Sequence, residues 1–255
     1  MKIISWNVNS IRAREPLVEK LIQKENPDIL CLQELKTEDK NIIDNFFQLH
    51  GYENISATQK AYNGVAIGYK NQNTIRTIDL DNLNTLQARN NCILIEDQKT
   101  VILNCYFPNG NPIGTDKFEL KTNWMKVMLE LLKELKREYN IIITGDFNVI
   151  PDSVDVYDSK RYEDDALFRL EIRKKFRELL NYGFNDVYRY FNKKKQEYTF
   201  WDYFAGSWQK NYGMRIDHFL VTNSLIADIK SIYINKKPRS KTKPSDHTPI
   251  ELEIT

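Results

Sequence analysis

Apolar residues are gathered in short runs along the chain, and the spacing within each run predicts the element that forms there. Alternating apolar and polar residues, or short unbroken apolar runs, are typical of strands. Such runs occupy residues 2–8, 27–34, 63–70, 74–80, 90–97, 99–107, 140–150, 198–201, 215–221, 229–234 and 249–254. Strands therefore dominate the predicted secondary structure.

Other segments have apolar residues three or four positions apart, which is the spacing of an amphipathic helix. These segments are residues 14–28, 37–51, 116–139 and 164–184. We find no internal linker, repeat or low-complexity block, so residues 1–255 are predicted to form a single domain. Strands that recur in pairs between helices predict an α/β (α+β) chain folded as a four-layer sandwich. In this fold two mostly antiparallel β-sheets pack face to face, with helices outside.

Composition narrows the class of protein without naming it. Apolar residues make up 41% of the chain, enough for a large core, and 37 basic residues nearly balance 35 acidic ones. Cys31, Cys92 and Cys105 are an odd number and lie in or beside apolar runs, which indicates reduced core cysteines. No signal peptide or membrane-length apolar run is evident, so a cytoplasmic protein without membrane contact is expected, by default a monomer.

Polar residues stand where several predicted strands end or begin. They are Asn7, Asn9, Glu34, Tyr106, Asn109, Asp146, Asn148, Asp217, Asp246 and His247. Strands of one sandwich share two rims, so side chains at strand ends can meet in space. Carboxylate and carboxamide oxygens suit Mg²⁺ or Mn²⁺, whereas zinc prefers more His and Cys. The set therefore predicts a site for metal-assisted phosphodiester hydrolysis.

Each of these residues also has a purely structural interpretation. Asn and Asp are favoured in turns, and Glu34 is a plausible acid of a first helical turn. His50 and His218 are both assigned structural roles. The co-occurrence of the same chemistry at the same end of several strands favours the site.

The ordered motifs of the chain carry a family resemblance. "WNVNSIRA", "LQELK", "YFPNG", "GDFNV", "TFWDY", "MRIDHFLV" and "PSDHTPI" follow one another from residue 3 to about residue 252. This series resembles the exonuclease III family of apurinic/apyrimidinic endonucleases, in the endonuclease/exonuclease/phosphatase superfamily with the deoxyribonuclease-I-like fold. "GDFN" and "SDH" alone mark only the superfamily, whereas "NVNSIRA", "YFPNG" and "YTFWDY" are closer to its DNA-repair branch.

The resemblance implies a hydrolase of DNA base excision repair. Its expected cofactor is Mg²⁺, with Mn²⁺ able to substitute, and its expected partner is double-stranded DNA with abasic sites or 3′ ends. It would cut the backbone 5′ to abasic sites and remove nucleotides or blocking groups from 3′ ends, as an exodeoxyribonuclease III does. The balance between these two activities stays open.

The resemblance also implies roles around the metal and the reacting phosphate. Glu34 would be the principal metal ligand, and the full metal set would be Asn7, Glu34, Asp146, Asn148, Asp246 and His247. Asp146 would orient and deprotonate the attacking water, and His247 would donate a hydrogen bond to a non-bridging phosphate oxygen. The general base is either of these two residues. Asp217 would fix the His247 ring, and Tyr106 would contact the phosphate or help the leaving oxygen.

DNA recognition is implied at separate positions. Phe200, Trp201, Phe204 and Met214 would form an apolar pocket for a sugar that lacks its base, although core packing is the alternative for one or two of them. Phosphate or other substrate contacts are implied for Asn9, Arg12, Asn109, Lys121 and Arg215. The basic segment 239–244 is either a further phosphate contact or a solvated loop.

Departures from the family pattern concern the grip on DNA. Ser10 replaces a usual Gly, and Leu35 replaces a common Thr. Residues 149–168 lack the asparagine-bearing loop of some relatives, and the acidic stretch 162–165 would repel phosphate if it faced the groove. Three alternatives therefore remain: a phosphoesterase acting on a small phosphorylated molecule, a non-catalytic binding module, and a secreted non-specific nuclease.

Overall fold

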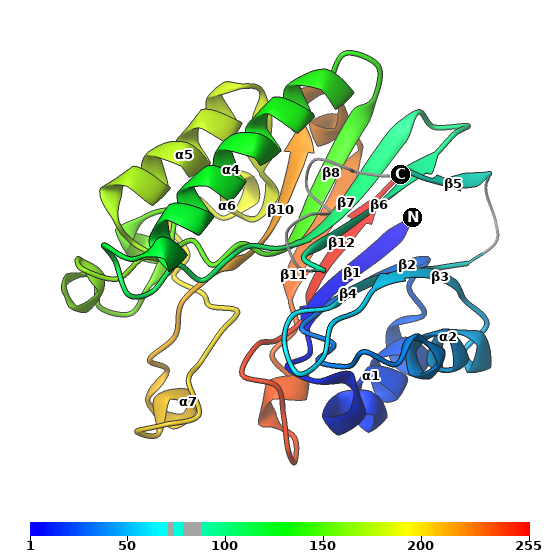
Figure 1. The fold of residues 1–255 in the computed structure, drawn as a ribbon, viewed down its shortest axis with the longest axis horizontal. Helices are drawn as coiled ribbons and strands as arrows, with labels where there is room; N and C mark the ends of the chain where they lie inside the picture. The colour runs from blue at the N-terminus through cyan, green and yellow to red at the C-terminus, as the bar shows by residue number, and fades with distance from the viewer. Residues whose placement is uncertain (71–73, 79–87) are drawn as a thin grey trace.

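The computed structural model describes residues 1–70, 74–78 and 88–255, and its strands form two β-sheets. The first sheet contains, in spatial order, β11 (Ile229–Ile234), β12 (Ile250–Ile254), β1 (Lys2–Asn7), β2 (Ile29–Gln33), β4 (Val65–Tyr69) and β3 (Glu53–Ala57). The second contains β5 (Ile75–Thr77), β6 (Asn90–Ile95), β7 (Thr100–Tyr106), β8 (Asn140–Asp146), β10 (Asp217–Thr222) and β9 (Phe184–Asp186). The N- and C-terminal strands β1 and β12 are neighbours in the first sheet (Figure 1).

Each sheet contains one parallel pair of strands. The pair is β1 with β2 in the first sheet and β7 with β8 in the second, and the other described neighbours are antiparallel. The prediction of two mostly antiparallel sheets is therefore confirmed. The two strands of each parallel pair are joined by a segment that contains a helix, because the chain must return to the starting edge of the sheet before the second strand begins.

Helices cover the outer faces of both sheets (Figure 1). The helices α1 (Ile11–Glu25) and α2 (Lys40–Leu49) pack on the first sheet, and α4 (Asp116–Leu135) and α5 (Leu170–Asn181) pack on the second. Shorter helices are α6 (Val187–Phe191) and α7 (Ser207–Lys210), and 3₁₀ turns lie at Ser153–Asp155, Ser159–Tyr162, Asn223–Asp228 and Pro238–Ser240. The four layers of the predicted sandwich are thus present.

Apolar side chains of the central strands are buried on both faces. Ile3 of β1 packs between the sheets with Ile102 and Ile142, whereas the next residue, Ile4, packs outward against Val18 of α1. Strands buried on both sides read as continuous apolar runs, which is why the sequence showed them clearly. The three cysteines are buried without disulfide bonds, as predicted.

Several element boundaries differ from the prediction. The helix predicted at 37–51 begins at Lys40, because Asp39 caps it by accepting a hydrogen bond from the Asn41 amide at 3.0 Å. The helix predicted at 164–184 forms only from Leu170 to Asn181, because the Asp165 carboxylate binds the Leu167 amide at 2.8 Å in a preceding turn.

Short elements were the least predictable. Residues 198–201 do not form a strand, since Phe200 makes only isolated bridges with Met214 and His247. The strands β3 and β9 were not predicted, because their few, largely polar residues form no long alternating pattern. Residues 79 and 80 of the strand predicted at 74–80 lie outside the described residues. Within the described ranges, no helix is long and apolar enough to cross a membrane.

Candidate active site

The carboxyl ends of the two parallel pairs meet at one rim of the sandwich. Asn7 ends β1 beside Gln33 of β2, and Tyr106 ends β7 beside Asp146 of β8. The Asn7 Nδ2 atom donates to the Asp146 Oδ2 atom at 2.9 Å, and this hydrogen bond joins the rims of the two sheets. The sheets thereby bring together residues that are far apart in the sequence.

Gly145 sets the position of Asp146. Its φ of 132° lies in the range that favours glycine, and an added Cβ would fall 1.9 Å from the Cys105 carbonyl oxygen on β7. Any side chain there would push β8 away from its parallel partner. The "GD" pair is thus a backbone requirement as well as a chemical one.

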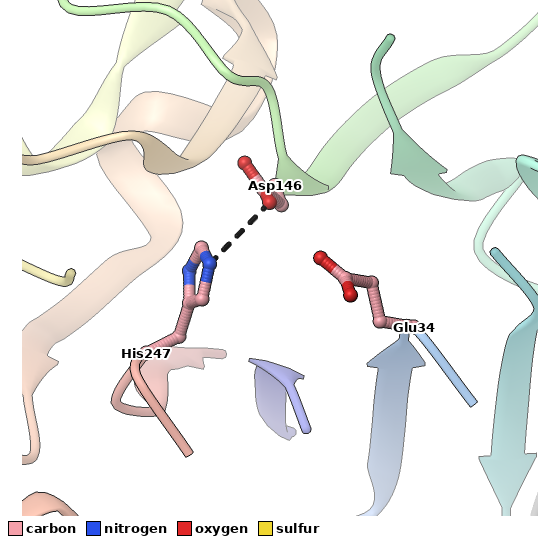
Figure 2. Close-up of side chains that lie close together, drawn as sticks. All are labelled: Glu34, Asp146 and His247. Carbon is pink, nitrogen blue, oxygen red and sulfur yellow. Dashed lines mark ion pairs between the residues drawn. The ribbon is translucent and has the colours of Figure 1, made fainter. Parts of the chain in front are cut away.

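Three acidic or imidazole groups converge above this rim (Figure 2). Glu34, Asp146 and His247 offer ligand atoms that all lie within 4.8 Å of one another. Asn7 Nδ2 also donates to Glu34 Oε1 at 2.9 Å and so links both carboxylates. Two carboxylates this close together, Asp146 buried and Glu34 partly exposed, are well suited to a divalent cation.

His247 is enclosed by carboxylates. Its Nδ1 atom lies 2.9 Å from Asp217 Oδ2, and its Nε2 atom lies 3.6 Å from Asp146 Oδ2. Burial lowers the pKa of His247, but Asp217 and Asp146 more than offset this effect and raise the pKa to about 10. His247 is therefore a positively charged donor at neutral pH, and this charge favours a contact with phosphate over the predicted role as a metal ligand.

The two carboxylates differ in their electrostatic surroundings. Burial raises the pKa of Asp146, as do the nearby Asp217 and Glu34 charges, while His247 opposes the rise. Burial also raises the pKa of Glu34, but Lys36 and Asn7 bring it below its ordinary value. Glu34 is thus stabilised as an anion, and Asp146 is the group at this rim that takes up a proton more readily than an ordinary aspartate.

The remaining predicted polar residues surround this centre. Asn148 lies at a φ of 49° and donates to the Phe107 carbonyl, while its Oδ1 atom accepts from Asn109 Nδ2 at 3.2 Å. Asp246 accepts a hydrogen bond from Asn9 Nδ2 at 2.9 Å and lines the same pocket as Glu34 and His247. The structure thus brings every predicted polar site residue to one rim, although Asp246 lies outside the three-residue cluster.

Two basic residues at the rim were not predicted. Lys36 Nζ lies 2.7 Å from Glu34 Oε2, and the "LQELK" motif contains it two positions after the glutamate. The Arg89 guanidinium lies 5.0 Å from the centroid of the Tyr106 ring. Arg89 precedes a strand without any motif of its own, so the sequence offered no indication of its position.

A pocket of about 500 Å³ opens beside the Glu34 and Asp146 carboxylates. Phe200, Phe204 and Met214 line it, as predicted for the substrate pocket, and Phe204 is 77% exposed. Trp201 is fully buried, packs against Trp208 and donates its indole N–H to Asn211 at 3.1 Å. The core-packing alternative therefore holds for Trp201, which supports the pocket from behind.

The predicted phosphate contacts need correction at two positions. Arg215 is buried and bonded to Asp155 and Asp186, each with one contact at 2.7 Å, so its charge is already neutralised. Lys121 is also buried, and its ammonium donates to the Asn109 and Asn148 carbonyls at 2.9 and 2.6 Å. Neither side chain is placed to contact a phosphate. Lys121 instead joins the loop that contains Asn109 to the loop that contains Asn148.

The basic segment 239–244 contains one buried basic residue and two exposed ones. Arg239 is buried and donates to the Trp201 carbonyl at 3.0 Å, so it is part of the structural support. Lys241 and Lys243 are exposed, as is Arg12, and these three side chains remain open to solvent. His50 and His218 lie outside the pocket lining, in keeping with their structural assignment.

Comparison with known proteins agrees with the geometry of this rim. The model of the endonuclease/exonuclease/phosphatase family matches residues 4–247. The chain belongs to this family. It is 32% identical over 270 residues to exodeoxyribonuclease III of Haemophilus influenzae, with 100% of both chains covered.

Solved structures of the endonuclease/exonuclease/phosphatase family share the whole fold. An AP endonuclease from Archaeoglobus fulgidus superposes with a TM-score of 0.92 at 31% identity, covering 100% of this chain and 99% of that one. A 3′ phosphatase from Neisseria, bound to a product DNA hairpin, gives the same TM-score, identity and coverage. The deoxyribonuclease-I-like fold predicted from the motifs is confirmed.

Proposed function

We propose that the protein is a Mg²⁺-dependent DNA-repair nuclease. It hydrolyses the backbone of double-stranded DNA 5′ to abasic sites and removes nucleotides or blocking groups from 3′ ends. The observation that carries this proposal is the rim at which Glu34, Asp146 and the Asp217–His247 pair face one aromatic pocket. Relatives of matching length named exodeoxyribonuclease III, and a structural neighbour bound to DNA, support it.

Glu34 and Asp146, with Asn7 beside them, would hold the cation. Their oxygens are the donors that Mg²⁺ prefers, and the buried carboxylates repel one another unless a cation lies between them. When bound, the cation would neutralise negative charge on the reacting phosphate. Mn²⁺ has similar ligand preferences and is expected to substitute.

Each remaining residue has a role that its environment supports. His247, held charged by Asp217, donates a hydrogen bond to a non-bridging phosphate oxygen as negative charge develops there. Burial, with the Glu34 and Asp146 charges, raises the pKa of Tyr106 well above its usual value, so the phenol stays protonated and can donate to an oxygen. Asp146 is then the better general base of the two, because its carboxylate has an available lone pair, whereas a protonated His247 ring has none.

A phosphoesterase for a small phosphorylated molecule is less well supported. Such an enzyme needs clustered basic side chains around a small polyanion. Among the described residues that line the pocket, none is Lys or Arg, whereas Phe200, Phe204 and several tyrosines are present. These aromatic walls suit part of a nucleic acid strand better than a phosphorylated sugar ring.

One experiment separates the candidates. An abasic-site duplex, an intact duplex and an inositol phosphate are each incubated with the protein, in Mg²⁺ or in EDTA. EDTA-sensitive nicking at the abasic site is the expected result. Release of phosphate from the inositol phosphate alone would contradict the proposal.

Substitutions of rim residues test whether the nicking activity depends on the rim. Glu34→Ala and His247→Ala should abolish nicking while circular dichroism remains native. Glu38→Ala and His50→Ala are matched controls, because both residues lie outside the pocket lining, and they should retain activity. Near-normal nicking by either rim variant would remove that residue from the proposed mechanism.

A further inference from the structure

Three tyrosines form one wall of the active-site pocket, and no role in hydrolysis accounts for them. This tyrosine wall consists of Tyr157, Tyr162 and Tyr212. The Tyr157 and Tyr212 rings stack with centroids 4.5 Å apart and planes 11° apart, and Tyr162 meets Tyr157 edge-on at 6.0 Å. Tyr212 is 41% exposed, so part of the wall is open to whatever enters the pocket.

Backbone pairing fixes the wall in place. The Tyr157 amide donates to the Gly213 carbonyl at 3.1 Å, and Val156 bridges Met214, so two distant segments are tied side by side. Arg161 lies 5.9 Å from the Tyr157 ring centroid, and Lys210 lies 5.8 Å from that of Tyr212. The aromatic surface is therefore preorganised before any ligand arrives.

We infer that the tyrosine wall is a subsite for the nucleobase of the nucleotide being removed from a 3′ end. This inference rests on the proposed nuclease function and specifies a substrate group for the same site. A base has a π-face that gains by contact with aromatic side chains, whereas a sugar that lacks its base has none. The wall thus contributes to removal of an intact nucleotide and adds little for an abasic residue.

The size of the pocket is consistent with a whole nucleotide. A cavity of about 500 Å³ falls within the roughly 300–1,000 Å³ range of sites that enclose a complete small ligand. Phe204, the most exposed aromatic residue of the pocket, adds a second apolar surface. Together these side chains offer more aromatic surface than a bare sugar needs.

The acidic residues of the same loop fit a base better than a phosphate. Asp165 lines the pocket, and its Oδ1 atom accepts a hydrogen bond from Asn111 Nδ2 at 3.1 Å. A carboxylate repels a phosphate group but can accept hydrogen bonds from the amino groups of bases. The acidic stretch 162–165 therefore places one carboxylate where base edges, and not backbone phosphates, would be accommodated.

The test compares two duplexes that differ only in the base of the terminal residue. Both have a recessed 3′ end, which is a thymidine in one duplex and a base-free tetrahydrofuran residue in the other. Single-turnover rate constants for removal of this residue are measured in Mg²⁺ for the wild-type protein and for Tyr212→Ala, Tyr212→Leu and Tyr212→Phe. The ratio of the two rate constants is the readout, because any general loss of structure or activity cancels in it.

Tyr212→Ala and Tyr212→Leu should lower the ratio of thymidine to tetrahydrofuran removal by about five- to 150-fold, the range that base–aromatic stacking provides. Tyr212→Phe keeps the aromatic face and should keep the ratio close to that of the wild type. Tyr233→Ala is the matched control, because Tyr233 is 52% exposed on β11 and lies outside the pocket lining.

The possible results are distinguishable. An unchanged ratio in Tyr212→Ala and Tyr212→Leu, including equal losses on both duplexes, would overturn the subsite and leave the nuclease function intact. If the wild-type protein removes neither the thymidine nor the tetrahydrofuran residue, both the proposed nuclease function and the subsite are contradicted.

Discussion

Two buried histidines on either side of the β10 strand have pKa values that are shifted in opposite directions. His247 faces Asp217 at the rim, and its pKa rises to about 10. His218 is the next residue after Asp217 but points away from the rim, where its Nδ1 atom lies 2.8 Å from the Arg215 guanidinium. Burial and Arg215 lower the pKa of His218 to about 4. Burial acts on both rings alike, so the sign of the neighbouring charge decides the difference.

The surroundings of these histidines also differ in function. Behind the rim, Arg215 is bonded to Asp155 and Asp186, and His218 Nε2 donates to the Val149 carbonyl at 3.0 Å. Every charge in this network is paired, so it holds β9, β10 and the loop after Asn148 together. At the rim, negative charge is in excess, which favours the binding of a cation. The same residue types thus build a support in one place and a reactive site in the other.

Backbone strain also differs between the rim and the buried residues around Arg215. Glu34, Asn148 and Ser10 at the rim have positive φ angles, whereas Arg215, His218 and their carboxylate partners do not. Positive φ in residues other than glycine costs free energy and collects at functional sites.

Arg215→Met is the change expected to disrupt the buried network of Arg215, Asp155 and Asp186 most severely. This change leaves the buried Asp186 without its arginine and removes one of the two arginines paired with Asp155. It should destabilise the fold by about 3–5 kcal/mol, measured by urea unfolding. Arg76→Met is the control, because Arg76 forms an exposed ion pair with Glu96 and should lose at most about 1 kcal/mol. A small effect of Arg215→Met would show that the network is not a structural support.

Asp217→Asn weakens the hold on the positive charge of His247. The change removes the carboxylate that raises the pKa of His247 most, and the single-turnover rate of abasic-site nicking should fall by about 10²–10³-fold. Asp97→Asn changes an exposed aspartate of the β6–β7 turn and should leave the rate unchanged. If Asp217→Asn is as active as the wild type, the rim does not depend on a charged His247.

The neutral state of His218 predicts an acid-sensitive stability. The pKa of His218 in the folded protein is about 4, below the ordinary 6.5. The contribution of neutral His218 to the free energy of unfolding is therefore present above pH 6.5 and is lost as the pH falls through 4. The contribution is on the order of 3 kcal/mol. Urea unfolding of His218→Gln should show a weaker pH dependence in this window, whereas His50→Gln should keep that of the wild type. Equal slopes in all three proteins would contradict a neutral His218.

The strain at the rim is relieved by Ser10→Gly. Ser10 has a φ of 93°, which a glycine adopts without cost, so this change should stabilise the protein by about 1 kcal/mol in thermal unfolding. Ser231→Gly in strand β11 is the control, because glycine in an extended strand should destabilise by about 0.5–1 kcal/mol. Destabilisation by Ser10→Gly would show that the turn is not strained.

Much of the fold could be predicted because the central strands are buried on both faces and read as continuous apolar runs. Asn7, Glu34, Asp146 and His247 could be proposed as neighbours because polar residues repeatedly follow strand ends. The short strands β3 and β9 and the loop at 198–201 could not be predicted, since pairing with other segments defines them and not an apolar pattern of their own.

By itself, the sequence determined the sandwich, the family motifs and the residue types of the rim. These features depend on local patterns and on residue types at fixed positions. Only the tertiary structure decided that Arg215 and Lys121 are buried supports, that Trp201 is core, and that Lys36 and Arg89 join the rim. It also decided that Tyr157 and Tyr212 stack, although they are distant in the chain. Burial and the sign of neighbouring charges arise from packing between distant segments, and no local pattern encodes them.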